Sequence, residues 1–358
     1  MTSTVSALSL VEPQLDSVAE FCYLDQSAVL AAGILDMQRA FDVIEEALIL
    51  LELGKCVQPH KVVLRDQETV ESESNGRFNA LFASIKGGRP AVGMKWIASF
   101  PANRLQGLPR ASAIIILNSP ENGFPVAMMD GTLVSAMRTG AVTGLGARNL
   151  AKQGARKVGI LGAGVQARTQ ILGLISALPQ IEEIAVFNRC EQHAEALIDE
   201  CTERWQAPVV KARSIAGALA DADVALTITT ASEPLMRAEH IKPGALTIQL
   251  SGHECEFDLL RQCQKLVVDN WDVIKHRGII TPAVMNLAGE LNDDAVYATL
   301  AQIMAGQKPG RSDDDERIHF AHMGMGVEDV ALGWDIYCRA SGLGIGQKLK
   351  LWDAPLWS

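Results

Sequence analysis

Residues 157–167 read Lys157-Val158-Gly159-Ile160-Leu161-Gly162-Ala163-Gly164-Val165-Gln166-Ala167. The short apolar run predicts a buried parallel strand, and the glycines predict a tight turn that opens a helix over Val165–Ala177. Strand, turn and helix together form the G-x-G-x-x-A version of the dinucleotide-binding fingerprint. A pyrophosphate would bind the free N–H groups at the positive end of that helix. Residues 162–167 are therefore predicted to bind a cofactor; the alternative is a glycine-rich structural turn.

Length, charge and cysteine content restrict the class of protein. The chain has 358 residues and a net charge of −10. The length predicts two domains, and the negative charge argues against nucleic acid or an anionic membrane as partner. No apolar run is long enough to span a bilayer, and Met1–Asp16 lacks the pattern of a secretory signal. Seven scattered cysteines without a C-x-x-C pair predict reduced thiols in the cytoplasm.

No metal site is expected. His319-x-x-His322 has one possible ligand spacing but lacks neighbouring acidic or cysteine ligands.

The pattern of the chain changes near Lys157. Before it, helices over 34–53 and 135–150 accompany strands of a mainly antiparallel or mixed sheet, expected at 62–64, 78–85, 91–97, 113–117 and 125–129. After it, strands alternate with helices that start near 189, 214, 239 and 257, and the strands are expected at 184–187, 209–211, 224–229, 246–250 and 265–268. Such alternation predicts right-handed crossovers and a parallel sheet. A last helix over 327–341 resembles the first part of the chain.

Asn188 and Arg189 follow the second strand of the predicted nucleotide-binding sheet. Sites that prefer NAD usually carry an acidic residue here, which accepts a hydrogen bond from the ribose 2′-hydroxyl. A guanidinium can instead pair with a 2′-phosphate. The cofactor is thus predicted to be NAD or NADP, with a preference for NADP; the alternative is an arginine at an exposed helix start.

Two cations are expected to hold a substrate carboxylate. Lys95 lies in a strand that otherwise looks buried, and Arg138 lies on a helix of small residues. A buried charge needs a partner or a cleft, and a guanidinium binds a carboxylate well. Lys61 and Arg110 are weaker candidates, because loop cations are usually solvated. The alternatives are an edge-strand lysine for Lys95 and a structural ion pair for Arg138.

Two loops are candidates for chemistry. Ser251-Gly252-His253-Glu254 follows a parallel strand at the edge where ligands bind, so His253 and Glu254 are candidate acid/base residues; the alternative is a helix-capping loop. Gly324-Met325-Gly326 opens a second helix, which it caps or brings to the nicotinamide side. The predicted cofactor set is completed by Thr139, Thr229, Ser251, Met325 and Gly326.

The assembled residues resemble the ornithine cyclodeaminase/mu-crystallin family. The resemblance rests on Lys95-Trp96-Ile97, Leu108-Pro109-Arg110-Ala111-Ser112, Ala136-Met137-Arg138-Thr139, the glycine fingerprint and Gly324–Asp329. Val57-Gln58-Pro59, the extension of the lysine motif through Pro101, and Leu108-Pro109-Arg110 most resemble the branch that makes 2,3-diaminopropionate for siderophores and peptide antibiotics. Its members are N-(1-amino-1-carboxy-2-ethyl)glutamate dehydrogenases.

The resemblance implies an α/β fold in which a doubly wound Rossmann domain, 149–321, is inserted into an α+β substrate-binding and dimerisation domain, 1–148 plus 322–358. It also implies a homodimer, a small amino-acid-derived substrate, and carboxylate binding by Lys95, Arg138 and a basic residue near Lys61. The predicted reaction oxidises the secondary amine and releases 2,3-diaminopropionate and 2-oxoglutarate. Lys95, His253 and Glu254 are the candidate catalytic residues.

Two departures keep alternatives open. His253 lies at or beside the position of the catalytic aspartate of cyclodeaminases, which disfavours ornithine cyclodeamination. Asn188 and Arg189 resemble the NADPH-binding mu-crystallins, whereas the diaminopropionate branch is expected to use NAD. The alternatives are ornithine cyclodeamination, ketimine or imine reduction with NADPH, opine- or alanine-type oxidation, and a non-catalytic NADPH-binding protein of mu-crystallin type.

Overall fold

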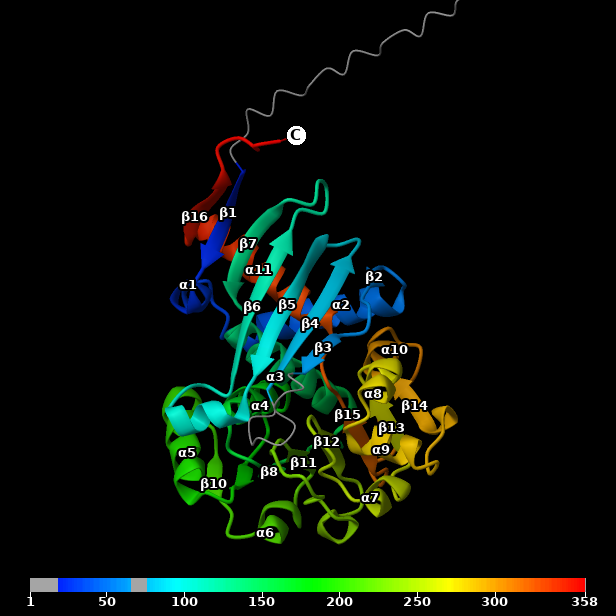
Figure 1. Cartoon of the computed structure of the whole chain (residues 1–358). Coiled ribbons are helices and arrows are strands. Elements are labelled where there is room, and N and C mark those ends of the chain that lie inside the picture. The colour runs from blue at the N-terminus through cyan, green and yellow to red at the C-terminus, as the bar shows by residue number, and fades with distance from the viewer. Residues whose placement is uncertain (1–18, 66–75, 358) are drawn as a thin grey trace, which may run out of the picture.

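Two eight-stranded sheets form the framework of the chain in a computed structural model (Figure 1). The structure describes residues 19–65 and 76–357. Met1–Asp16, for which the sequence predicts no secretory signal, lies outside these residues. The described part contains no helix that is long and apolar enough to cross a membrane.

The first sheet is mainly antiparallel, as the sequence predicts. Its central strands are β4 (Arg77–Ile85), β5 (Ala91–Ser99), β6 (Ala111–Asn118) and β7 (Pro125–Asp130), and each pairs antiparallel with the next. The strands expected at 113–117 and 125–129 are therefore confirmed as the antiparallel pair β6 and β7. The sheet is completed on one side by β2 (Cys56–Val57) and β3 (Val62–Arg65), and on the other by β1 (Ala19–Leu24) and β16 (Gln347–Trp352).

Helices cover one face of this sheet. They are α1 (Gln26–Ala31), α2 (Met37–Glu52), α3 (Gly131–Leu150) and α11 (Gly326–Leu343). The helix expected at 34–53 is confirmed as α2: the Asp36 carboxylate accepts the N–H of Arg39 at its start, and Gly54 adopts φ +68° after its end. Both features are standard helix-end signals. β16 pairs antiparallel with β1, so the C-terminal segment belongs to the first sheet. The domain limits 1–148 plus 322–358 and 149–321 stay a prediction.

The second sheet is entirely parallel, as predicted. Its order is β10 (Val209–Lys211), β9 (Glu183–Phe187), β8 (Lys157–Leu161), β11 (Val224–Thr227), β12 (Leu246–Gln249), β15 (Ile318–Ala321), β13 (Lys265–Val268) and β14 (Val296–Thr299). The order reverses between β8 and β11, which is the point where doubly wound sheets bind ligands. β14 and β15 were not expected, because Tyr297 and Thr299 in the first and His319 in the second interrupt the apolar run that marks a buried parallel strand.

Short helices connect these strands. They are α4 (Val165–Ala177), α5 (Glu191–Trp205), α6 (Ile215–Leu219), α7 (Phe257–Arg261), α8 (Trp271–Arg277), α9 (Thr281–Leu287) and α10 (Leu300–Met304). The helix expected near Glu239 is only a 3₁₀ turn, η3 (Ala238–His240). Two further 3₁₀ turns among the described residues are η2 (Pro101–Gln106) and η4 (Asp293–Ala295).

Small residues join the two sheets. Figure 1 shows α3 and α4 lying between them. A Cβ on Gly140 of α3 would lie 2.2 Å from the carbonyl oxygen of Thr169 on α4, and one on Gly173 would lie 2.2 Å from that of Gly140. Because only glycine permits this approach, the two helices cross backbone to backbone and the apolar core runs through both parts.

Candidate active site

The glycine turn after β8 has the geometry that a dinucleotide requires. Gly162 has φ +112°, and a Cβ there would lie 2.7 Å from the carbonyl oxygen of Ile228. A Cβ on Gly164 would meet nothing within 4 Å. No side chain of the described residues caps α4, which begins directly after Gly164, so the N–H groups of Val165 and Gln166 have no side-chain acceptor. The exposed side chain of Val165 (68%) also leaves this helix end uncovered.

These features fit a bound nicotinamide dinucleotide, because free backbone donors at a helix N-terminus with open space around them hold a pyrophosphate. Asn188 lies beside the turn: its Oδ1 accepts the N–H of Ala163 at 3.2 Å, and its Nδ2 donates to the carbonyl of Cys190 at 2.8 Å. The Asn188 side chain therefore braces the turn, while Arg189 next to it is exposed.

The loops after β11 and β12 are tied together by a buried carboxylate. Glu254 is fully buried and accepts the backbone N–H of Thr229 at 2.8 Å, and also the hydroxyls of Thr229 and Ser251. Thr229 also lies next to Gly162. The carboxylate thus fixes the rim of the predicted cofactor site, and these contacts favour a positioning role for Glu254.

His253 is half-buried and stacks on Phe257, with ring centroids 5.2 Å apart. Burial lowers the pKa of its imidazole, and Nε2 has no hydrogen-bond partner. A neutral imidazole with a free nitrogen can accept a proton, so an acid/base role for His253 stays a prediction.

Two buried cations meet two buried carboxylates between β5, α3 and α11. Lys95 Nζ donates to Asp329 at 2.7 Å and to Ser135 Oγ at 3.0 Å. Arg138 donates through Nε to Asp329 and through Nη1 to Glu328, both at 3.0 Å. The structural ion pair left open for Arg138 is therefore present. Nη2 of Arg138 makes no hydrogen bond among the described residues, so a carboxylate could still bind there.

Burial sets the protonation of this cluster. Burial, and then the charge of Arg138, lowers the pKa of Lys95 to about 8, although Asp329 opposes the shift. Burial raises the pKa of Glu328 to about 7, against the effect of Arg138. The group can therefore gain or lose a proton close to neutral pH.

Asp269 links this cluster to the parallel sheet. It directly follows β13, is buried, and accepts the backbone N–H groups of Met323 and Gly324, both at 2.7 Å. Gly324 in turn packs on Arg138: a Cβ there would lie 1.8 Å from Nη1. The substrate-binding candidates thus lie next to the edge of the sheet that carries the glycine turn.

Lys61 lies at the same junction and lines a small cavity with Gln58, Gly324 and Met325. Burial, and then the charge of Arg277, lowers its pKa to about 8; Asp269, Arg138 and Lys95 also act on it. The structure therefore groups Lys61 with Lys95 and Arg138, as expected.

The other predicted residues lie around this group. Thr139 follows Arg138 on α3 and donates to the carbonyl of Ser135 at 2.7 Å. Met325 is buried, and a Cβ on Gly326 would lie 2.5 Å from the carbonyl oxygen of Phe82. Arg110 lies further out, directly before β6.

Three acidic residues of the cluster were missed as site candidates: Asp269, Glu328 and Asp329. Asp269 carried a usable signal, since it ends the apolar run Leu266-Val267-Val268 at the carboxyl edge of a parallel strand.

The two spaced histidines take part in other contacts. His319 Nδ1 bonds the hydroxyl of Thr247 at 2.8 Å, and His322 Nε2 bonds that of Thr143 at 2.9 Å. Both histidines are fully buried, and burial lowers the pKa of each imidazole to about 3.

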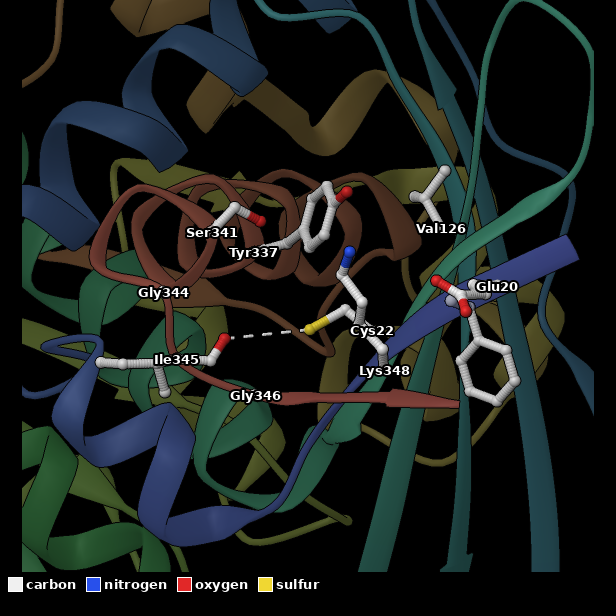
Figure 2. Close-up of a pocket in the computed structure, with 10 residues that line it drawn as sticks. Glu20, Cys22, Val126, Tyr337, Ser341, Gly344, Ile345, Gly346 and Lys348 are labelled. Atoms are coloured by element: carbon white, nitrogen blue, oxygen red, sulfur yellow. Dashed lines mark hydrogen bonds between the residues drawn. The ribbon is translucent and has the colours of Figure 1, made fainter. Parts of the chain in front are cut away.

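A separate pocket lies at the far end of α11. Figure 2 shows Cys22 and Lys348 from the paired strands β1 and β16 facing Tyr337 and Ser341 of that helix. Glu328 and Asp329 lie in the first turn of α11, and an 18-residue helix is about 27 Å long. This pocket is therefore distinct from the candidate site.

The fold and the turn place the chain in a class: nicotinamide-dependent oxidoreductases, as the sequence predicts. Within that class, the profile of the ornithine cyclodeaminase/mu-crystallin family matches residues 26–343, and the chain belongs to that family. The predicted resemblance is confirmed.

Two relatives are equally similar in sequence. An alanine dehydrogenase from Archaeoglobus fulgidus is 32% identical over 89% of this chain and 95% of its own length. An N-((2S)-2-amino-2-carboxyethyl)-L-glutamate dehydrogenase from Staphylococcus aureus is 32% identical over 93% of this chain and 99% of its own length.

Solved structures agree with the fold. The Thermococcus litoralis Δ1-pyrroline-2-carboxylate reductase in complex with NADH and L-proline superposes with a TM-score of 0.85, at 27% identity, over 91% of this chain and 99% of that one. An archaeal alanine dehydrogenase dimer with bound NAD superposes with a TM-score of 0.84, at 31% identity, over 93% of this chain and 100% of that one. These structures confirm the predicted α/β fold with a Rossmann sheet. They and the relatives also confirm the predicted class of enzyme, an oxidoreductase that acts on CH–NH bonds with a nicotinamide cofactor.

Proposed function

We propose that this chain oxidises the secondary amine of N-(1-amino-1-carboxy-2-ethyl)glutamate and releases 2,3-diaminopropionate and 2-oxoglutarate. The observation that carries the proposal is the buried cation pair Lys95 and Arg138 beside the cofactor edge of the parallel sheet. The relative from Staphylococcus aureus, aligned over almost its whole length, supports this substrate.

In this reaction the chain's main task is to position the substrate. Arg138 and Lys95 bind a carboxylate of the amino acid and so orient its Cα–H bond, which is catalysis by proximity and orientation. The glycine turn and the start of α4 would hold a nicotinamide dinucleotide, which would supply the hydride acceptor for this oxidation. Water then attacks the substrate iminium carbon, and the C–N bond breaks to give the ketone and the primary amine.

Proton transfer needs a base for the water and an acid for the departing amine. Lys95 and Glu328, whose pKa values lie near 8 and 7, can serve close to neutral pH. His253, with its free Nε2, is a further candidate base.

The test is direct. Purified protein is incubated with N-(1-amino-1-carboxy-2-ethyl)glutamate and either NAD⁺ or NADP⁺, and the reduced cofactor, 2-oxoglutarate and 2,3-diaminopropionate are measured. Equal amounts of all three products support the proposal. Alanine, ornithine and a cyclic imine with reduced cofactor are run in parallel. Turnover of one of these in place of the glutamate derivative refutes the proposed substrate, and alanine is the second candidate because of the Archaeoglobus relative.

The preference for NADP is part of the proposal and rests on Arg189, which is exposed beside the turn. The cytoplasm is proposed as the location because all seven cysteines are free thiols.

A homodimer is proposed from the open face of the first sheet. Helices cover one face, while the other presents Phe82, Trp96 and Ile114, which are exposed by 40%, 37% and 37% on adjacent strands. Apolar patches of this kind mark contact surfaces, and the archaeal alanine dehydrogenase is a dimer. Light scattering of the chain and of Trp96→Glu tests this: a monomeric wild-type protein refutes it.

A further inference from the structure

Four arginines gather where the two sheets face each other. Arg65 and Arg77 are direct register partners across β3 and β4. Arg77 in turn lies opposite Ser99 of β5, and Ser99 lies opposite Ala111 of β6. Arg110, directly before Ala111, accepts the N–H of Phe100 through its carbonyl oxygen at 2.7 Å. Three strand ends therefore bring Arg65, Arg77 and Arg110 to one edge of the sheet.

The fourth arginine comes from the other sheet. Arg277 ends α8, which Figure 1 shows beside β3. The ring of His276 stacks on that of His60, just before β3, with centroids 4.9 Å apart. This contact fixes the end of α8 against the first sheet and brings Arg277 to the other three arginines.

Among the residues that the structure describes, no carboxylate neutralises the guanidinium groups of Arg77, Arg110 and Arg277. The Nε atoms of Arg77, Arg110 and Arg277 are buried without a hydrogen-bond partner. Burial, and then the charges of Arg77 and Arg65, lowers the pKa of Arg277 to about 10; burial, and then Arg110 and Arg65, lowers that of Arg77. No carboxylate of the described residues contributes to either shift. Buried guanidinium donors that lack an acceptor among these residues form an arrangement that an external anion would complete.

The inner cations differ in this respect, because Lys95 and Arg138 have Asp329 and Glu328 as partners. Lys61 connects the two groups, since the charges of both Arg277 and Arg138 lower the pKa of its amine. Lys61 therefore lies between the inner site and the outer arginines.

We propose that Arg77, Arg110 and Arg277 form a second carboxylate subsite, which selects substrates whose amine nitrogen carries a dicarboxylate arm. Arginine suits this task because its planar fork binds a carboxylate through two parallel hydrogen bonds. The inference rests on the proposed function for the identity of the inner site. The subsite would favour such a substrate over alanine, whose single carboxylate is bound by Lys95 and Arg138.

Binding without turnover tests the subsite. 2-Oxoglutarate and pyruvate share an oxo-acid group, and only the first carries a distal carboxylate. Their affinities are measured by calorimetry on the chain saturated with its preferred nicotinamide cofactor, for the wild type, Arg110→Gln and Arg277→Gln. Arg204→Gln is the matched control, since Arg204 is an exposed arginine that pairs with Glu200 on α5. Melting curves verify that each variant is folded.

The expected result is that 2-oxoglutarate binds the wild type more tightly than pyruvate. Each subsite variant should raise the dissociation constant of 2-oxoglutarate about tenfold or more and leave that of pyruvate within about twofold of the wild-type value. In the control variant, both dissociation constants should stay within about twofold of the wild-type values. Equal losses for both ligands, or no loss, overturn the subsite. If the glutamate derivative is not oxidised while the difference still depends on Arg277, the proposed function fails and the subsite stands. If the glutamate derivative is oxidised while the variants bind 2-oxoglutarate normally, the proposed function stands and the subsite fails.

Discussion

Asp329→Asn removes the carboxylate that is shared by Lys95 and Arg138. Asp329 is fully buried, and its oxygens lie 2.7 Å from Lys95 and 3.0 Å from Arg138. Loss of one partner from a buried ion pair costs about 3–5 kcal/mol. Two features of the site limit this cost. Arg138 keeps Glu328. Burial already lowers the pKa of Lys95 to about 8, and without Asp329 to oppose this shift the amine of the variant loses its proton more readily at pH 7. We therefore expect a loss near the lower limit, about 3 kcal/mol.

The loss should also depend on pH. Asp329 stabilises Lys95 only while the amine is charged, so the difference between variant and wild type should shrink as the pH rises from 7 through the Lys95 pKa of about 8. The assay is urea unfolding at pH 7, 8 and 9. Asp353→Asn is the matched control, because it breaks an exposed pair with Lys350 and should leave the midpoint unchanged.

Two results would refute this reasoning. A loss below about 1 kcal/mol at pH 7 would mean that the buried pair is not in place. A large loss that stays constant from pH 7 to 9 would indicate that the new amide packs poorly at this position, with no charge imbalance at Lys95.

Further predictions concern the cofactor and the substrate. Gly164→Ala should leave stability unchanged but weaken binding of reduced cofactor, because its methyl group enters the open space at the turn; Gly162→Ala should lower both stability and binding, since its Cβ meets the Ile228 carbonyl oxygen. A wild-type dissociation constant for reduced cofactor in a fluorescence titration of Gly164→Ala would contradict the predicted loss of binding. The KM for the carboxylate substrate should rise as the pH passes about 8, where Lys61 and Lys95 lose charge, and Lys61→Arg should flatten the rise. A KM that is constant up to pH 9.5 excludes the role of these amines. Arg189→Asp should lower the affinity for NADPH relative to NADH by about tenfold; an unchanged ratio of dissociation constants contradicts the preference for NADP.

Much of the second sheet could be predicted, because local signals coincide with the structure there. The strand at 157–161, the glycine turn and the helix at 165–177 form as expected. Apolar runs separated by polar turns mark buried parallel strands well. β15 escaped prediction because His319 interrupts the apolar run in Ile318-His319-Phe320-Ala321. That histidine is accommodated by a hydrogen bond to Thr247 of the neighbouring strand, which no local pattern reveals.

The site was predicted only in its cations. Lys95 and Arg138 stand out because a charge is costly in an apolar or small-residue setting. Their partners Glu328 and Asp329 follow 190 and more residues later at the start of a helix, where acidic residues are common for local reasons. The acid or base role that the sequence predicts for Glu254, from a loop at a ligand-binding edge, stays a prediction. The fold turns this carboxylate inward onto Thr229 and Ser251, contacts that no local pattern reveals.

The sequence by itself determined the cofactor turn, the parallel sheet and the identity of the inner cations, since each depends on residues that are close together in the chain. Only the tertiary structure decided which charges are neutralised. Arg138 lies 190 residues from Glu328, and Arg277 reaches Arg77 from the opposite sheet. Pairing of charges depends on distance and burial in space, and those quantities are fixed only when the two sheets pack together.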